Sequence, residues 1–466
     1  MLTATPARVA IDPDFAAIRA REFSRLDAQR HAYLDYTGSA LYGEQQLRAQ
    51  QTLLADGIYG NPHSDNATSR ASTALLDEAR RAVLRFVDAD PAAYSVIFTA
   101  NTSAAIKLVA ESYPFGTGGA FVLTADNHNS VNGVREYARR AGAAVHYVGL
   151  DASLRLRNAI GVLDAATSPA DAASAGTHAP ARLFAYPPQS NFSGVKHPLA
   201  LVAAAHARGY DVLLDAAAFV PTSRLSLRDV PADFVAMSFY KVFGYPTGVG
   251  ALVARHDAMR KLSRPWFAGG TVEYASIQND THRLRAHGEG FEDGTPNFLG
   301  VAAVPAGFTL IDEVGVDRIG AHVHALTATL LTALQTPAHA NGRPIVQLYG
   351  PTDVTDRGGT VAFNLLDPAG RVIPFARVEE RARTAGVSLR GGCFCNPGAS
   401  EAAFGFPADA AAACFRQNAG GDFSVDAFAA CLGGDYAVGA VRISLGLANN
   451  LDDVRRAVDV IAAFRA

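Results

Sequence analysis

Short apolar runs alternate with helix-like segments between residues 75 and 260, and this alternation constrains the fold most. The predicted strands span residues 95–99, 120–124, 144–148, 182–186 and 211–214, and predicted helices over 103–112 and 131–141 lie between them. Strands spaced by helices indicate βαβ units and a mostly parallel sheet. Ligands of such sheets bind beyond the carboxyl ends of the strands, so a functional site is expected there.

The chain is too long for one ordinary domain, because it has 466 residues. Its last third has the pattern of a smaller α+β domain: helical at 301–314, strand-like at 361–365 and 441–445, and helical again at 451–464. We expect an N-terminal segment (1–45) that packs with the small domain, a large α/β domain (46–299) and a small C-terminal domain (300–466). Residues 164–180 are predicted to form an exposed loop, and 401–438 show no assignable pattern.

Composition and charge exclude several classes of protein. The 41 basic and 44 acidic residues leave a net charge of −3, which argues against a nucleic-acid or basic membrane surface. No apolar run approaches the ~18 residues of a membrane helix, and Asp12 and Asp14 interrupt any signal-peptide pattern. Four cysteines in so long a chain fit a reducing compartment rather than a disulfide framework. These features predict a cytoplasmic protein without nucleic-acid or membrane partners.

Lys241 and Asp215 form the pair with the most specific chemical pattern. Asp215 ends an apolar run, and Lys241 lies 26 positions later, between another apolar run and a glycine-containing turn. A lone lysine at such a place is usually solvated surface, but these flanking patterns favour a functional role. An enzyme that uses pyridoxal phosphate (PLP) needs a lysine for the imine and an acid against the pyridinium nitrogen. The pair therefore predicts a PLP site.

Polar residues follow three other predicted strands. Thr102 and Ser103 open a helix, where backbone N–H groups and hydroxyls can bind phosphate, although both are also common helix caps. His128 follows the next strand and could stack on a planar ring, or it could be an ordinary loop histidine. Asn191 lies in an amide-rich turn that could face a ligand.

A glycine-flanked loop at 391–398 carries two of the four cysteines, Cys393 and Cys395. The glycines predict a mobile loop with little bulk near the thiols. One of the thiols could be a nucleophile, or both could be small buried residues. A metal site is not expected, because C-x-C without a second Cys/His pair is a poor zinc pattern. Cys414 and Cys431 lie in alanine-rich stretches and are predicted to fill core or loop.

Arg442 lies in an apolar, β-branched strand pattern, where a guanidinium group is costly unless it is paired. Its planar fork could hold a substrate carboxylate through two hydrogen bonds. An internal salt bridge would explain the residue equally well.

These residues together resemble the class V, fold-type I PLP enzymes of the cysteine desulfurase group. The likeness is closest to the N-terminal desulfurase domain of molybdenum cofactor sulfurases and covers nearly all of the chain. The segments that carry it are 21–26, 33–38, 59–64, 238–250, 291–297, 392–399 and 439–446. The resemblance implies a seven-stranded, mostly parallel sheet in the large domain, PLP as cofactor, and a homodimer with active sites at its interface.

The resemblance also implies roles for individual residues. Lys241 resembles the Schiff-base lysine, Asp215 the pyridinium partner and His128 the ring-stacking histidine. The implied contacts of the cofactor phosphate are Thr102, Ser103, Ser238 and, lent to the neighbouring subunit, Thr295. Asn191 resembles an asparagine that faces cofactor and substrate, and Arg442 the arginine that binds the substrate carboxylate. Cys395 resembles the persulfide cysteine, with Arg390 before its loop, and Cys393 is the less expected nucleophile.

Two positions depart from the pattern of many desulfurases. Tyr240 stands where histidine often precedes the lysine, and Ala218 stands where glutamine often reaches the ring hydroxyl. Molybdenum cofactor sulfurases also carry a C-terminal domain for the molybdenum cofactor, whereas this chain stops at Ala466. The sulfur acceptor is therefore expected outside the chain.

The function implied is conversion of L-cysteine to L-alanine, with a persulfide on Cys395 and transfer of its sulfur to an unknown acceptor. The same scaffold supports aminotransferases, amino-acid epimerases and selenocysteine lyases, because fold alone does not determine the reaction. A non-enzymatic sulfur carrier is a further alternative, although the intact set of candidate residues argues against it.

Overall fold

The computed structural model of the chain describes residues 12, 14–166, 180–405, 407–418, 424–432 and 437–465. The predicted loop at 164–180 lies mostly outside the described residues. Residues 164 and 165 instead end a helix, α8 (Ala159–Ala165).

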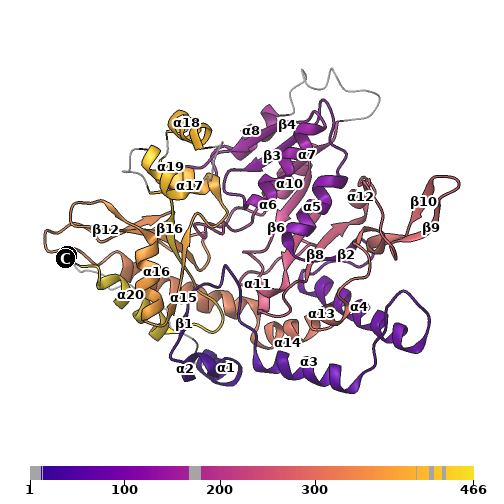
Figure 1. Cartoon of the computed structure of the whole chain (residues 1–466), viewed down its shortest axis with the longest axis horizontal. Helices are drawn as coiled ribbons and strands as arrows, with labels where there is room; N and C mark the ends of the chain where they lie inside the picture. The colour runs from indigo at the N-terminus through magenta and orange to yellow at the C-terminus, as the bar shows by residue number, and fades with distance from the viewer. Residues whose placement is uncertain are drawn as a thin grey trace.

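A seven-stranded sheet forms the centre of the large domain (Figure 1). Its strands are β2 (Tyr94–Thr99), β3 (Ala120–Thr124), β4 (Ala144–Val148), β5 (Arg182–Tyr186), β6 (Asp211–Asp215), β7 (Phe234–Ser238) and β8 (Gly250–Arg255). The spatial order is β2-β8-β7-β6-β5-β3-β4. Only β8 runs antiparallel to its neighbours, and the pairs from β7 to β4 are parallel. The prediction of a mostly parallel, seven-stranded sheet is therefore confirmed.

Helices cover both faces of this sheet (Figure 1), so its strands other than the edge strand β4 are mostly buried. The helices of this part of the chain are α3 (Glu44–Asp56), α4 (Ala67–Phe86), α5 (Thr102–Ser112), α6 (Asn129–Asn132), α7 (Val134–Arg140), α8, α10 (Leu201–His206), α11 (Phe239–Phe243), α12 (His256–Met259) and the 3₁₀ helix η1 (His287–Phe291). Along β3, Phe121 and Leu123 enter one hydrophobic cluster and Val122 enters the other. This alternation explains why the strands are continuous apolar runs in the sequence.

The small domain contains a second, antiparallel sheet with helices against it. Its strands are β11 (Val346–Tyr349), β12 (Thr360–Leu366), β13 (Val372–Ile373), β15 (Arg390–Gly392) and β16 (Ala440–Ser444), and its helices include α16 (Phe375–Thr384) and α20 (Leu451–Ala462). The order is β11-β12-β16-β15, with β13 on β12. The expected α+β character is observed.

The N-terminal segment lies against the small domain. It contains α1 (Asp14–Glu22), α2 (Ser24–Ala28) and β1 (Ala32–Tyr33), and β1 pairs with β14 (Val387–Ser388). The buried Arg19 guanidinium bonds to Asp453 at 2.7 Å, and the Phe15 ring stacks on His322 with centroids 3.9 Å apart. The exact boundaries at residues 45 and 299 stay a prediction.

Three consecutive helices connect the two sheets: α13 (Phe298–Val301), α14 (Val304–Val314) and α15 (Val316–Leu334). The sequence predicts one helix over 301–314, but α14 begins at Val304 with Pro305 in its first turn. Proline fits the first turn of a helix because its missing N–H has no intrahelical acceptor there. No single described helix is long and apolar enough to cross a membrane; Phe298–Val314 and Val316–Leu334 pass only as a pair bent by 68°.

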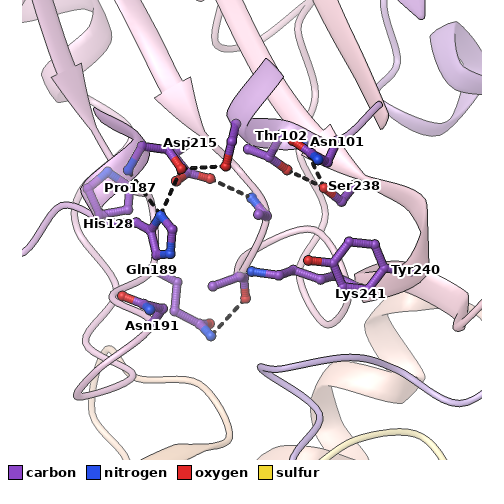
Figure 2. A pocket seen from close by; sticks show the side chains of 14 residues that line it. Asn101, Thr102, His128, Pro187, Gln189, Asn191, Asp215, Ser238, Tyr240 and Lys241 are labelled. Atoms are coloured by element: carbon purple, nitrogen blue, oxygen red, sulfur yellow. Dashed lines mark hydrogen bonds between the residues drawn. The ribbon is translucent and has the colours of Figure 1, made fainter. Parts of the chain in front are cut away.

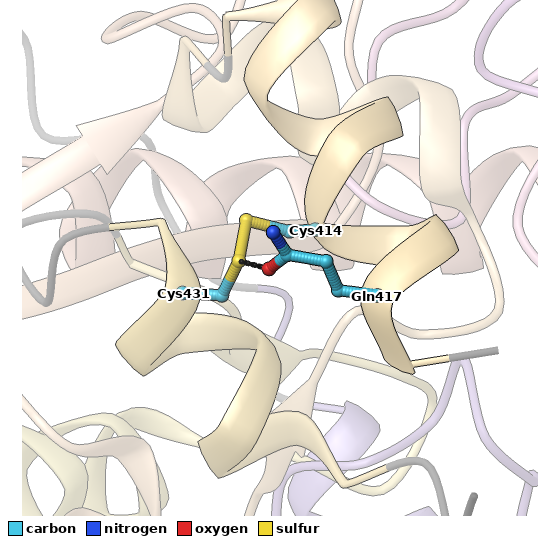
Figure 3. The surroundings of a disulfide bond; sticks show 3 residues. All are labelled: Cys414, Gln417 and Cys431. Atoms are coloured by element: carbon cyan, nitrogen blue, oxygen red, sulfur yellow. Dashed lines mark hydrogen bonds between the residues drawn. A yellow bond between two sulfur atoms is a disulfide. The ribbon is translucent and has the colours of Figure 1, made fainter. Parts of the chain in front are cut away.

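The unassigned stretch at 401–438 contains parts of three helices, α17 (Pro397–Phe404), α18 (Ala408–Asn418) and α19 (Val425–Cys431). A disulfide between Cys414 and Cys431 joins α18 to α19 (Figure 3). The prediction that these two cysteines are only core or loop filler is therefore wrong. Their sequence separation of 17 gives no sign of pairing, and only the packing of the two helices brings their Cα atoms to 5.7 Å.

A β-hairpin projects from the large domain, on the right of Figure 1. It consists of β9 (Val272–Ser276) and β10 (Thr281–Leu284). Ile277, at its tip, is 100% exposed, and Tyr274 is also exposed.

Candidate active site

One cavity lies at the carboxyl ends of the parallel strands and collects most of the predicted site residues (Figure 2). It contains about 640 Å³ of empty space, part of it open to solvent. The predicted residues that line it are Thr102, Ser103, His128, Asn191, Asp215, Ser238 and Lys241. Residues from the ends of five strands (β2, β3, β5, β6 and β7) therefore meet in one place, as expected for an α/β sheet.

The start of α5 forms one end of the cavity. The backbone N–H of Thr102 donates to Ser238 Oγ at 2.8 Å, and Asn101 caps the helix by accepting from the Ala104 N–H at 3.0 Å. Among the described residues, the Ser103 N–H has no acceptor. A helix N-terminus with a free N–H and three hydroxyl or amide side chains is a ready site for an anionic group.

Asp215 and Lys241 supply opposite charges to the same cavity. Asp215 is buried at the end of β6, where its carboxylate accepts from the Ala217 N–H at 3.2 Å. Burial lowers the pKa of Lys241, Asp215 opposes that shift, and the guanidinium groups of Arg442 and Arg390 add to it. The lowered pKa increases the fraction of neutral amine, which is the form that acts as nucleophile or base.

His128 lies beside Asp215 and caps the short helix α6. Its Nδ1 accepts a hydrogen bond from the Ser130 N–H at 3.1 Å, which leaves Nε2 to carry the proton of the neutral ring. Burial lowers the pKa of His128, with Asp215 opposing the shift. The imidazole is therefore held neutral and oriented at the cavity wall.

The cysteine loop is attached to the large domain next to this cavity. Asn191 Nδ2 donates to Phe394 O at 2.9 Å, and the Asn129 N–H donates to Cys395 O at 2.8 Å. Asn396 Nδ2 donates to Asn191 Oδ1 at 2.8 Å. These bonds hold the backbone of the predicted mobile loop, and both thiols, Cys393 and Cys395, remain exposed.

Cys395 lies near two arginines. Its charge acts on the guanidinium groups of both Arg390 and Arg442. That Cys395 rather than Cys393 is the nucleophile stays a prediction.

Arg442 and Arg390 share one acidic partner, Asp35. Arg442 Nη2 lies 3.0 Å from Asp35 Oδ1, and Arg390 Nη2 lies 2.7 Å from Oδ2. Arg442 is buried, which lowers its pKa, and its Nη1 donates to Asn191 O at 3.0 Å. The internal salt bridge that the sequence left open is therefore present. Binding of a substrate carboxylate by Arg442 stays a prediction.

Replacing Asp35 with asparagine is expected to lower the free energy of unfolding by about 3 kcal/mol, because it leaves the buried Arg442 charge without its partner. Denaturant unfolding followed by circular dichroism measures the change. Asp317→Asn is the matched control, since its pair with Arg224 is exposed and should change stability by less than about 0.5 kcal/mol. Equal effects of the two variants would contradict the importance of the Asp35 pair.

Asp35 and Asn396 belong to this site although the sequence did not single them out for a role, whereas Gln189 lies in the turn whose amide side chains were expected to face a ligand. Asp35 lies more than 400 positions from Arg442, and Asn396 anchors the cysteine loop to the Asp126 carbonyl at 2.7 Å. Gln189 lines the cavity and donates to Ala218 O at 2.9 Å, at the position where the usual glutamine is absent. The only signal in the sequence was that a buried Arg442 needs an acidic partner, and the sequence did not identify that partner.

Thr295 is the one predicted phosphate contact outside the cavity lining. It is exposed in the turn after η1, and its Oγ1 accepts from Asn61 Nδ2 at 3.5 Å. Thr295 is therefore free to reach another molecule.

Comparison with known proteins agrees with this geometry. The aminotransferase class-V family model matches residues 32–457. A molybdenum cofactor sulfurase of Solanum lycopersicum is 38% identical over 414 residues, which are 82% of this chain and 49% of that protein. This chain thus spans about half the length of that relative.

Solved structures share the fold along almost the whole chain. A cysteine desulfurase from Thermococcus onnurineus superposes with a TM-score of 0.76 at 24% identity, covering 97% of this chain and 98% of that one. A C-DES variant with glycine covalently linked to the PLP cofactor has a TM-score of 0.70 at 16% identity, with coverages of 95% and 98%. The match to the family model over more than nine-tenths of the chain, together with the fold, shows that this chain belongs to the aminotransferase class-V family.

Proposed function

We propose that the protein is a PLP-dependent cysteine desulfurase, which converts L-cysteine to L-alanine and transfers the sulfur to Cys395. One observation carries the proposal. The amine of Lys241, the carboxylate of Asp215 and a helix N-terminus line a single cavity, and the loop that holds Cys395 is bonded to Asn191 in the same lining. An aminotransferase or epimerase would need the cavity but not the exposed thiol at its edge.

The residues present fit PLP. Thr102, Ser103 and Ser238 at the start of α5 would hold its phosphate, and Asp215 would pair with its ring nitrogen. His128 would lie against the ring, and Lys241 would bind it covalently. Bound there, PLP would supply an electron sink that stabilises negative charge on the substrate α-carbon.

The side chains of the protein would carry out the remaining steps of the reaction. Arg442 would hold the substrate carboxylate, and Lys241 Nζ would take the α-proton and return a proton to the product. The Cys395 thiolate would attack the substrate sulfur, so that the Cβ–S bond breaks, a sulfur–sulfur bond forms and Cβ gains a proton. Cysteine and the thiol thereby become alanine and a persulfide, and no external oxidant is needed.

The sulfur acceptor follows by analogy with the curated relatives. Proteins named molybdenum cofactor sulfurase are 34–39% identical to this chain, and the chain spans 49–59% of their length. We therefore propose the molybdenum cofactor as acceptor, held by a separate protein or domain. We also propose a cytoplasmic location, because a reducing compartment keeps the free thiols of Cys393 and Cys395 reduced, although the Cys414–Cys431 disulfide argues in the other direction.

A direct assay tests the reaction. Purified, PLP-loaded protein is incubated with L-cysteine, and alanine and the Cys395 peptide are followed by mass spectrometry. Stoichiometric alanine with one added sulfur on that peptide is expected. An intact PLP spectrum without alanine would contradict the proposal and favour an aminotransferase, epimerase or lyase with another substrate.

We further propose a homodimer in which Thr295 completes the partner's phosphate site. Its exposure outside the cavity, and the exposed Tyr274 and Ile277 of the projecting hairpin, support this arrangement. Lys241→Ala and Thr295→Ala chains, each weakly active alone, are expected to regain activity when unfolded and refolded together, because about a quarter of all sites then combine both intact residues. Activity that remains the sum of the separate variants would show that Thr295 serves its own chain.

A further inference from the structure

A second cavity lies between the large and small domains and shares no lining residue with the candidate active site. It contains about 560 Å³ of empty space, part of it open to solvent. Lys196 and Thr222 of the large domain, Gly320 and His324 of α15, and Arg357 before β12 contribute to its lining. No aspartate or glutamate is among the described residues that line it.

Arg357 provides a buried positive charge without an acidic partner. Its side chain is 3% exposed, and Nη2 donates to the carbonyls of Ser193 at 2.9 Å and Thr360 at 2.6 Å. Its Nη1 bonds to a third carbonyl, that of Pro351. Among the described residues, Nε has no acceptor and no carboxylate lies within ion-pair distance. Burial lowers the pKa of Arg357 to about 10, and the charge of Asp353 only partly opposes that shift.

Lys196 is a second cation without a partner in the described part of the chain. Its side chain makes no hydrogen bond or ion pair there, and its ammonium group only faces the Phe219 ring at 5.9 Å from the centroid. Burial lowers the pKa of Lys196, and Asp356 only partly opposes the shift. Lys196 and Arg357 thus bring two poorly solvated positive charges to one cavity.

Helix α15 closes the other side of the cavity. A Cβ atom on Gly320 would lie 2.8 Å from the Thr222 carbonyl, so only glycine allows the helix to approach this closely. His324 lies one turn further along the same helix face and can donate a hydrogen bond through a ring nitrogen. The wall of the cavity therefore presents donors and positive charge rather than acceptors.

We propose that this cavity binds a phosphate-class oxyanion, either inorganic phosphate or the phosphate group of a small ester. Buried charges are costly unless they are paired, and an anion would compensate Lys196 and Arg357 together. A dianion with several acceptor oxygens suits two cations and a histidine donor better than a single carboxylate does. The proposal does not depend on the reaction at Lys241, because the two cavities have separate linings.

Calorimetric titration of the PLP-loaded protein with inorganic phosphate, at constant ionic strength, tests the proposal. PLP occupies the phosphate site at α5, so the heat reports on other sites. Saturable binding is expected, with affinity reduced tenfold or more in Lys196→Gln and reduced in His324→Gln. Lys107→Gln is the matched control, because Lys107 is exposed and paired with Glu111 elsewhere, and it should bind as the unchanged protein does.

The contrary results are equally clear. No saturable phosphate binding, or equal affinity in Lys196→Gln and the unchanged protein, would overturn the proposal, as would acetate that binds as tightly as phosphate. Glycerol 3-phosphate distinguishes the two sources: tighter binding identifies an ester, and equal or weaker binding identifies the free anion. If Lys196→Gln lowers the midpoint of thermal unfolding, His324→Gln provides the test instead, because His324 is exposed and its replacement should not affect folding.

Discussion

Replacing Lys241 with alanine is expected to reduce alanine formation from L-cysteine by at least about 10³-fold. A positioned proton-transfer group alone contributes roughly 10²–10⁴-fold, and Lys241 is also the proposed covalent anchor of PLP. The amine lies in the same cavity as Asp215 and His128, and burial lowers its pKa toward the range where it acts as a base. Single-turnover alanine formation measures the effect, and the visible absorbance of lysine-bound PLP should disappear as well.

Lys107→Ala is the control for this result, since Lys107 is exposed on α5, pairs with Glu111 and does not line the cavity. It should keep both the absorbance and the turnover. Turnover by Lys241→Ala within tenfold of the unchanged protein, at equal PLP content, would show that another group moves the proton. A matching thermal midpoint would exclude misfolding as the cause of any loss.

Replacing Cys395 with serine is expected to reduce sulfur transfer by at least about 10²-fold, because the nucleophile and its neighbours act as one catalytic unit. The absorbance of bound PLP should stay intact. Cys393→Ser is a closely matched control. Both cysteines are exposed in the same loop, and Cys395 lies near Arg390 and Arg442. The measurements are the persulfide on the loop peptide and the alanine released.

The two variants separate the possible outcomes. Loss of sulfur transfer in Cys393→Ser, with retention of sulfur transfer in Cys395→Ser, would show that Cys393 carries the persulfide. Full alanine formation in both single variants and in the double variant would show that neither thiol takes part in the reaction. The class V fold would then serve a lyase or aminotransferase reaction.

The large sheet was predictable because its local pattern and its tertiary role agree. Predicted strands at 120–124, 144–148 and 182–186 match β3, β4 and β5 at both ends. β3 and β5 are buried on both faces, and such strands are continuous apolar runs in the sequence. Polar residues after those runs then have to meet at one edge of the sheet, which is why the cavity could be predicted.

Helix ends were less predictable, since they depend on single residues. The predicted helix over 131–141 is two helices, α6 and α7, that meet at Gly133. The predicted helix from residue 301 begins instead at Val304. A glycine or proline raises the free energy of continuing a helix by about 1–3 kcal/mol, and tertiary packing decides whether the helix continues despite that cost.

Some contacts could not be predicted from the sequence. The disulfide of Cys414 with Cys431 depends on how α18 packs on α19, and the roles proposed for Thr295 and Arg442 depend on a second chain and a substrate. The paired charges of Asp35, Arg390 and Arg442 join the N-terminal segment to two strands of the small domain.

The sequence by itself determined the α/β architecture and the chemical types that meet at the cavity, because hydrophobic periodicity and strand-end positions are local properties of the chain. Only the tertiary structure decided which acid pairs with Arg442, which amide groups hold the cysteine loop, and that Lys196 and Arg357 share a cavity without an acid. Such pairings join segments hundreds of residues apart. Their energies depend on distance and burial, and neither quantity is encoded by the neighbours of a residue in the sequence.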